Sequence, residues 1–208
     1  MVHLADFLGA PSGASETVTP MRFATVLRLK ADGTREAARL RWGLVPSWAT
    51  DPNRSPLIHA RAESLGERPA FREAFAGRRG LLVVQTFNEG KEITPNKTEQ
   101  HTITPDDGRP LAIAVVWDRW QDPLGRGPPL ESFAMVTVPA NSLIATITDR
   151  MPAVLAPEHW SAWLGEEPSD AHALKAMLKP FEGRWTMRPE KPQKPTRPRS
   201  EDLQPRLL

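Results

Sequence analysis

Few side chains in this 208-residue sequence have the chemistry of a nucleophile or a metal ligand. There is no cysteine and no tyrosine, which excludes disulfides, thiolate metal sites and cysteine nucleophiles within these residues. The five histidines are scattered along the chain, at His3, His59, His101, His159 and His172. No phosphate-binding glycine loop, zinc-ligand spacing, GxSxG or HExxH string occurs. The sequence therefore predicts neither a metal site nor a cofactor.

The elements that must position any functional group are short and mostly strands. Alternating or β-branched runs predict strands, which we expect at 22–30, 35–42, 80–87, 111–117 and 132–138. Short helices are expected at 67–76, 157–164 and 170–178. Pro69 suits the start of the first helix, and Asp170 is in position to cap the last. The fold class predicted from these patterns is a mixed, strand-rich α+β domain.

The chain divides into an arm, one domain and a tail. Residues 1–16 are rich in small residues and form the N-terminal arm, and residues 17–187 form the domain. The segment 188–208 has five prolines and carries six Lys or Arg against three acids, so we expect a basic, disordered tail. The sequence has neither an apolar run of membrane-spanning length nor a signal peptide, which predicts a soluble, cytoplasmic protein.

Six separated strings, in order and spacing, resemble those of one known family. They are RWGLVPSW at 41–48, IHARAE at 58–63, FREAFAGRR at 71–79, AVVWDRW at 114–120, TVPAN at 137–141 and TDRMP at 148–152. This pattern is similar to that of the SRAP family, the SOS response-associated peptidases, which act on abasic sites in single-stranded DNA. The resemblance implies a barrel-like β-sheet core with short flanking helices.

The resemblance also implies a nucleophile that this sequence lacks. Family members begin with Met-Cys, and the exposed cysteine captures the abasic aldehyde as a thiazolidine through its amine and thiol. Position 2 here is Val2, and the chain contains no cysteine. A thiazolidine therefore cannot form on these residues. We expect non-covalent binding, or at most a transient imine on the N-terminal amine, whose ordinary pKa leaves a usable neutral fraction at pH 7.

The three positions that the resemblance implies for proton chemistry are only partly kept. Glu89 matches the family glutamate, while Thr148 replaces the histidine of HDRMP and His59 replaces the asparagine of NARAE. The histidine is the group whose ordinary pKa lies near neutrality, so its loss removes a proton carrier. Glu89 is either a surviving acid–base group or a surface acid in a loop. His59 either compensates for the missing histidine or is an ordinary polar residue.

The expected DNA contacts come from the matched strings. They are Pro46, Trp48, Arg61, Glu63, Arg78, Arg79 and Arg150. Trp48 either offers a surface on which an unpaired base stacks or belongs to the core. The arginines either bind phosphates or form ion pairs within the protein. We expect a DNA-binding groove if five arginines share a face, and a surface for protein partners if they are scattered; they are Arg61, Arg72, Arg78, Arg79 and Arg150.

These observations favour a DNA-damage-response protein that binds single-stranded DNA, at abasic sites or junctions, as a monomer. The family's crosslinking and peptidase activities are expected to be absent. Two alternatives stay open. One is a pseudoenzyme that acts as a scaffold for protein partners, and the other is a weak imine-based lyase that uses the N-terminal amine.

Overall fold

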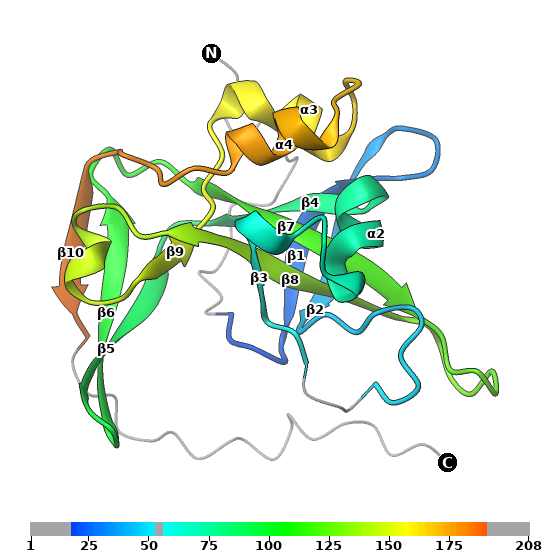
Figure 1. The fold of residues 1–208 in the computed structure, drawn as a ribbon, viewed down its shortest axis with the longest axis horizontal. Coiled ribbons are helices and arrows are strands. Elements are labelled where there is room, and N and C mark those ends of the chain that lie inside the picture. Colours follow the sequence, from blue (N-terminus) through cyan, green and yellow to red (C-terminus); the bar gives the residue numbers. More distant parts are fainter. Residues whose placement is uncertain (1–17, 53–55, 191–208) are drawn as a thin grey trace.

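The computed structural model describes residues 18–52 and 56–190 (Figure 1). Its strands are β1 (Phe23–Leu29), β2 (Arg35–Trp42), β3 (His59–Arg61), β4 (Arg79–Val84), β5 (Phe87–Thr94), β6 (Lys97–Pro105), β7 (Leu111–Trp120), β8 (Leu130–Pro139), β9 (Arg150–Pro152) and β10 (Trp185–Pro189). Its helices are η1 (Ala62–Ser64), α2 (Pro69–Gly77), η2 (Ile144–Thr146), η3 (Pro157–His159), α3 (Trp160–Leu164) and α4 (Ala171–Met177). None of these helices is long and apolar enough to span a membrane.

Five strands close into a barrel, which confirms the predicted strand-rich, barrel-like core. Antiparallel pairs run in the order β2-β1-β4-β7-β8, and β8 then returns to β2. The closing contact is parallel and short, with Arg41 opposite Ser132 and Trp42 opposite Phe133. β3 and β9 pair with the part of β8 that continues past this contact. The sheet therefore extends beyond the barrel and carries residues from three separate segments there.

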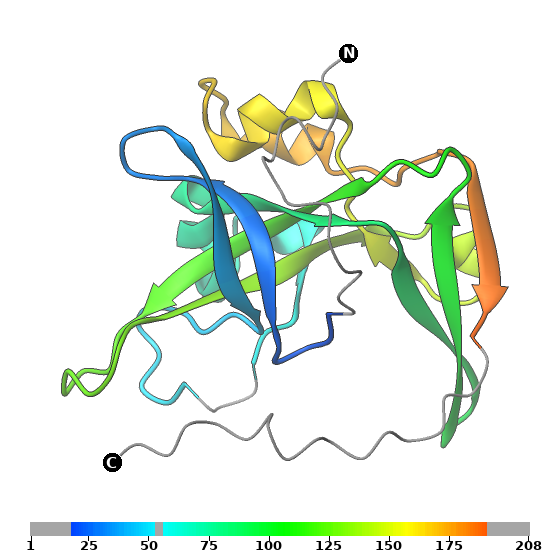
Figure 2. The same ribbon diagram turned by 180° about the vertical axis from the view of Figure 1, so that it is seen from behind.

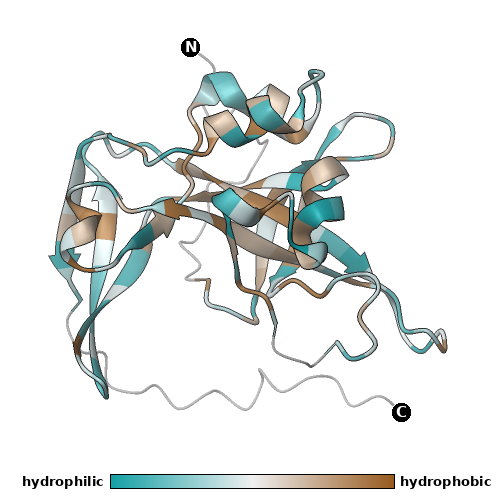
Figure 3. Ribbon diagram, in the orientation of Figure 1, coloured by the Kyte–Doolittle hydropathy of each residue, from teal (hydrophilic) through white to brown (hydrophobic). Residues whose placement is uncertain are grey.

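A smaller sheet, in the order β10-β6-β5, lies beside the barrel (Figures 1 and 2). It is more hydrophilic than barrel strands β7 and β8 (Figure 3). Phe87, Ile103 and Trp185 nevertheless join the hydrophobic core, and the rings of Phe87 and Trp185 meet edge-on with centroids 5.7 Å apart. These contacts fix the position of β5, which carries Glu89.

The small sheet extends past residue 188, the predicted start of the tail. β10 pairs Arg188 and Pro189 with Thr102 and His101 of β6, so two residues assigned to the tail belong to the sheet. The arm over 1–16 and residues 191–208 lie outside the described residues.

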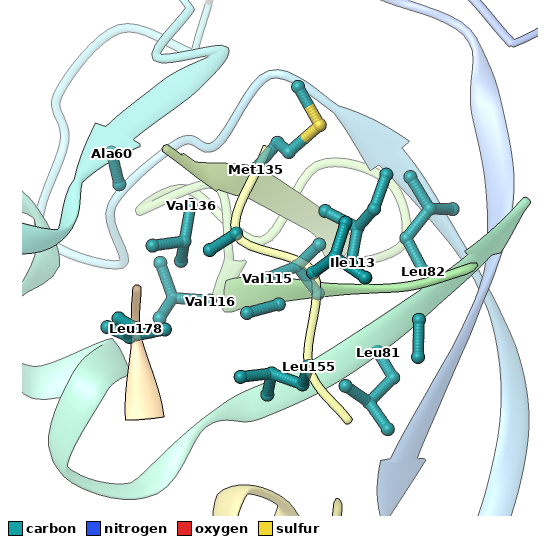
Figure 4. Packing of buried hydrophobic residues seen from close by; sticks show 14 of the residues in the cluster. Ala60, Leu81, Leu82, Ile113, Val115, Val116, Met135, Val136, Leu155 and Leu178 are labelled. Carbon is teal, nitrogen blue, oxygen red and sulfur yellow. The ribbon is translucent and has the colours of Figure 1, made fainter. Parts of the chain in front are cut away.

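Branched aliphatic side chains fill much of the core (Figure 4), and buried aromatic side chains join them. The buried ring of Trp163 in α3 packs against β4, and its Nε1 donates to the carbonyl oxygen of Gly80 at 2.9 Å. A Cβ atom at Gly80 would lie 2.7 Å from Cγ1 of Val26, so a larger residue would not fit between the strands. Asp170 caps α4 as predicted, because its carboxylate accepts from the backbone N–H of Ala173 at 2.7 Å.

Candidate functional site

His59 and Arg61 lie side by side on one face of β3. Both are exposed, and the alternation of the strand buries Ala60 between them. The indole Nε1 of Trp42 donates to the carbonyl oxygen of Ile58 at 2.9 Å, and its ring lies 6.1 Å from that of His59. Desolvation by the neighbouring groups lowers the pKa of His59. This environment favours the neutral imidazole.

Arg150 and Glu63 form a two-pronged ion pair beside Arg61. The two terminal nitrogens of Arg150 donate to the Glu63 carboxylate at 2.7 and 2.9 Å. One of them also donates to the carbonyl oxygen of Thr137 on β8 at 2.7 Å. The hydrogen bond from Arg150 lowers the pKa of Glu63, and the charge of Arg61 adds to this effect. The pair joins η1 to β9, and Arg61 is the residue directly before η1.

Glu89 has an environment suited to proton transfer. It is half-buried on β5, directly opposite His101 of β6. Burial raises the pKa of Glu89 to about 7, and the negative charge of Asp149 contributes further. Asp149 is held just before β9, where its carbonyl oxygen accepts from the N–H of Ala140 at 3.0 Å. A carboxyl with such a pKa both donates and accepts protons at neutral pH.

Thr148 stands beside Asp149 but cannot replace a histidine in proton transfer. Its backbone N–H donates to the carbonyl oxygen of Ile144 at 3.0 Å, which holds the turn after η2. A threonine hydroxyl does not titrate near neutral pH. Of the three predicted catalytic positions, Glu89 therefore has the chemistry of a neutral-pH acid–base group.

Trp48 lies on a loop that is fixed to the barrel wall. The N–H of Val45 donates to Ser132 Oγ and that of Ser47 to Asp118 Oδ2, each at 2.9 Å. The Trp48 side chain is 60% exposed, so its ring is available for stacking. Pro46, in the same loop, is buried.

Arg78 and Arg79 are not brought together with Arg61 and Arg150. Arg79 is buried and donates to the carbonyl oxygens of Trp163, Phe75 and Ala76 at 2.6 to 2.8 Å. Arg78 is half-buried and forms ion pairs with Asp118 at 3.2 Å and Glu73 at 3.7 Å. These contacts leave no surface of Arg79 for a phosphate, and they engage Arg78 with acids of the protein itself.

Residues 18–52 and 56–190 contain no cluster of three or more His, Asp or Glu side chains arranged to hold a metal ion. The site is instead a surface of acids, arginines and aromatic rings at the end of the barrel. Its members come from β3, η1, β5 and the segment leading into β9.

Comparisons with known proteins agree with this architecture. A family model described as SOS response associated peptidase (SRAP) matches residues 10–192. The chain is 32% identical over 159 residues to the abasic site processing protein YoqW of Bacillus subtilis (strain 168), covering 76% of this chain and 70% of that protein. It is 31% identical over 132 residues to the abasic site processing protein YedK of Escherichia coli (strain K12), covering 64% and 56%.

Solved structures show the same fold. A protein from Bacteroides thetaiotaomicron superposes with a TM-score of 0.72 at 25% identity, over 82% of this chain and 75% of that one. One from Bordetella bronchiseptica has a TM-score of 0.73 at 24% identity, over 86% and 90%. The class of protein is therefore a strand-barrel relative of abasic site processing proteins. The chain belongs to the SRAP family, as its sequence strings predicted.

Two neighbours of Glu89 were missed by sequence reasoning. Asp149 lies within the TDRMP string, which by itself assigns it no role, yet its charge raises the pKa of Glu89. His101 was counted among scattered histidines, yet it is buried directly opposite Glu89. The alternation of Thr and Ile in HTITP at 101–105 was a usable strand signal for His101.

Proposed function

We propose that this protein binds single-stranded DNA at abasic sites without the cysteine-dependent crosslink. The observation that carries this proposal is the surrounding of Glu89, whose pKa is raised to about 7 by burial and by Asp149. The next residue, Arg150, is paired with Glu63 beside Arg61. The family membership supports DNA damage as the setting. The absence of cysteine from all 208 residues leaves no thiol to close a thiazolidine ring.

Each group has a distinct task in this proposal. Arg61 binds a phosphate through its planar fork of donors. Glu89 handles the proton that moves when the abasic sugar opens from its ring form to the aldehyde, because its pKa lies near neutrality. Neutral His59 hydrogen-bonds a sugar hydroxyl beside it. Trp48 stacks an unpaired base next to the lesion, a contact that tolerates any sequence.

The test is a pair of gels with a labelled single-stranded oligonucleotide that contains one abasic site. We expect a shifted band in the native gel, and no covalent band in the denaturing gel with or without borohydride. An intact oligonucleotide of the same sequence and the Glu89→Gln variant serve as controls. A covalent band without borohydride, or failure of the folded protein to bind either oligonucleotide, would contradict the proposal. A band only with borohydride would instead establish an imine on an amine of this chain.

A protein-binding scaffold is the second candidate, and one observation favours it. Arg78 and Arg79 are engaged within the protein instead of extending a basic groove. On this alternative, folded protein binds neither intact nor abasic single strands. The native gel described above therefore separates the two candidates.

A further inference from the structure

Asn141 ends the TVPAN string, and the proposed function gives this string no role. It follows the end of β8 by two residues and is buried, with 4% of its surface exposed. Both ends of its side-chain amide are engaged. Oδ1 accepts from the backbone N–H of Ile144 at 3.0 Å, and Nδ2 donates to the carbonyl oxygen of Phe181 at 2.9 Å. A buried amide that is satisfied in this way fixes the two segments that it joins.

The first of these segments is the turn between β8 and β9, which leads to Asp149. The side chain of Asn141 holds Ile144, the first residue of η2. The carbonyl oxygen of Ile144 in turn accepts from the N–H of Thr148 at 3.0 Å. The turn closes where the N–H of Ala140 donates to the carbonyl oxygen of Asp149, also at 3.0 Å. The backbone around Asp149 is therefore held by a turn that begins at Asn141.

The second segment leads into β10 and reaches the strand that carries Glu89. The carbonyl oxygen of Phe181, which accepts from Asn141, also accepts from the indole Nε1 of Trp185 at 3.3 Å. The rings of Phe181 and Trp185 meet edge-on with centroids 5.5 Å apart, and Trp185 also meets Phe87 of β5. Phe87 and Glu89 are two residues apart and lie on the same face of β5. One amide thus joins the turn between β8 and β9 to the small sheet.

Other ionisable side chains share this face of the small sheet with Glu89. His101 is directly opposite Glu89, and Lys91 and Glu99 are opposite each other two residues further along the hairpin. Burial is the larger cause of the raised pKa of Glu89, and the charge that adds to it is that of Asp149. The repulsion between two carboxylates weakens as they move apart and as water comes between them. It therefore depends on how firmly the turn before β9 is held.

We propose that Asn141 is a positioning residue for the proton chemistry of the site, because it holds the turn that places Asp149 near Glu89. This inference rests on the proposed function, in which Glu89 handles the proton of the abasic sugar. Loss of the Nδ2 donor releases the turn from the segment that contains Phe181. Asp149 then moves away from Glu89, and less of the Glu89 carboxyl is protonated at neutral pH.

The experiment is a carbon-13 NMR titration of the Glu89 carboxyl in full-length protein. It compares wild type, Asn141→Ser, Asp149→Asn and the double variant. Serine keeps an oxygen that accepts from the N–H of Ile144, but its hydroxyl is too short to reach the carbonyl oxygen of Phe181. We expect Asn141→Ser to lower the pKa of Glu89 by most of the decrease that Asp149→Asn causes. In the double variant, Asn141→Ser should cause no further decrease.

Ser132→Ala is the matched control, because Ser132 is also buried and its side chain also binds a backbone N–H, that of Val45. It should leave the titration of Glu89 unchanged. Near-UV circular dichroism verifies that each variant is folded. Asn141→Thr is the second variant if the serine variant does not fold, because its extra methyl group fills part of the space that the amide leaves.

An unchanged Glu89 pKa in the folded Asn141 variant would overturn the inference. An equal decrease with and without Asp149 would also overturn it, because Asn141 would then act through the burial of Glu89. If neither Asn141 variant folds, the residue is a requirement of the fold and the inference is wrong. The proposed function is tested separately, because wild-type protein that fails to bind abasic DNA would refute that function and leave the titration results in place.

Discussion

Glu89 shows how the environment of one side chain sets its chemistry. The same carboxyl on an open loop would be ionised at neutral pH. On β5 it is half-buried beside the charge of Asp149, and its pKa rises to about 7. The unfolded chain does not share this effect, so the proton affinity of Glu89 is coupled to folding.

Replacing Glu89 by glutamine should stabilise the protein at alkaline pH. Between the ordinary glutamate pKa and about 7, the folded state holds a proton that the unfolded state has lost, so the native carboxyl costs stability as pH rises. A difference of one between the folded-state and unfolded-state pKa corresponds to about 1.4 kcal/mol. Glu89→Gln should therefore raise the free energy of unfolding by about 2–3 kcal/mol near pH 8. No change is expected near pH 4. Urea denaturation at both pH values measures this, and a gain that does not depend on pH would contradict it.

The Asp149→Asn variant isolates the second cause of that pKa. Removing the neighbouring negative charge should lower the pKa of Glu89 while leaving it above the ordinary glutamate value, because burial is the larger cause. Carbon-13 NMR titration of the glutamate carboxyls measures the change. Asp122→Asn, on the distant β7–β8 connection, is the control and should leave the titration of Glu89 unaltered. A Glu89 pKa that does not move would mean that Asp149 has no electrostatic role.

The Arg150–Glu63 pair should depend on its two-pronged geometry. Lysine cannot reproduce two parallel hydrogen bonds and the bond to Thr137. We expect Arg150→Lys to lose most of a coupling of about 1 kcal/mol, measured in a double-mutant cycle with Glu63→Gln. Because Arg150 lowers the pKa of Glu63, the coupling is present at neutral pH and is lost as pH falls through the lowered pKa of Glu63. Coupling that persists in acid would contradict this explanation.

At the scale of elements, local patterns identified the barrel but missed the sheet that carries Glu89. Strand β2 begins and ends where its alternation predicted, at Arg35 and Trp42. By contrast, β5 and the first half of β6 are polar and exposed, so hydrophobic periodicity gives no sign of them. β3 and β9 are three residues each and exist through their pairing with β8. The proximity of Asp149 to Glu89 depends on these long-range pairings, which no local pattern contains.

Arg79 holds helices α2 and α3 together and is not available for a ligand. Its guanidinium ties the end of α2 to α3 through three carbonyl oxygens. Charged hydrogen bonds of this kind contribute roughly 1.5–3 kcal/mol each, and they are not additive. We expect Arg79→Met to lower the free energy of unfolding by about 3–5 kcal/mol, as for a buried network that loses one partner. Arg72→Met, an exposed change on α2, should have little effect on chemical denaturation.

That experiment also separates packing from DNA contact. Arg79→Met protein that remains folded at low temperature should bind a single-stranded oligonucleotide as wild type does. A loss of binding without a loss of stability would restore Arg79 to the interface.

At the scale of the whole molecule, the small sheet depends on a strand from the other end of the chain. β10 covers the edge of β6, and Trp185 packs against Phe87 and Phe181. A chain that ends after Glu190 keeps these contacts and should melt as the full-length protein does. A chain that ends after Arg184 exposes the edge of β6 and should melt at a lower temperature, which calorimetry measures. Equal melting temperatures for both would show that β10 does not stabilise the site.

The short parallel contact between β2 and β8 has a consequence for the order of folding. Hairpins such as β1–β2 and β7–β8 join neighbours in sequence, so they form at little entropic cost. The closing contact consists of two residue pairs. One of them joins Arg41 to Ser132, and most of the barrel's residues lie between these two in the sequence. Contacts between residues so far apart in the sequence are slow to form. Two residue pairs alone add little stability until the rest of the barrel has formed. The barrel should therefore close late, and a weakened contact there should speed unfolding while leaving the folding rate almost unchanged.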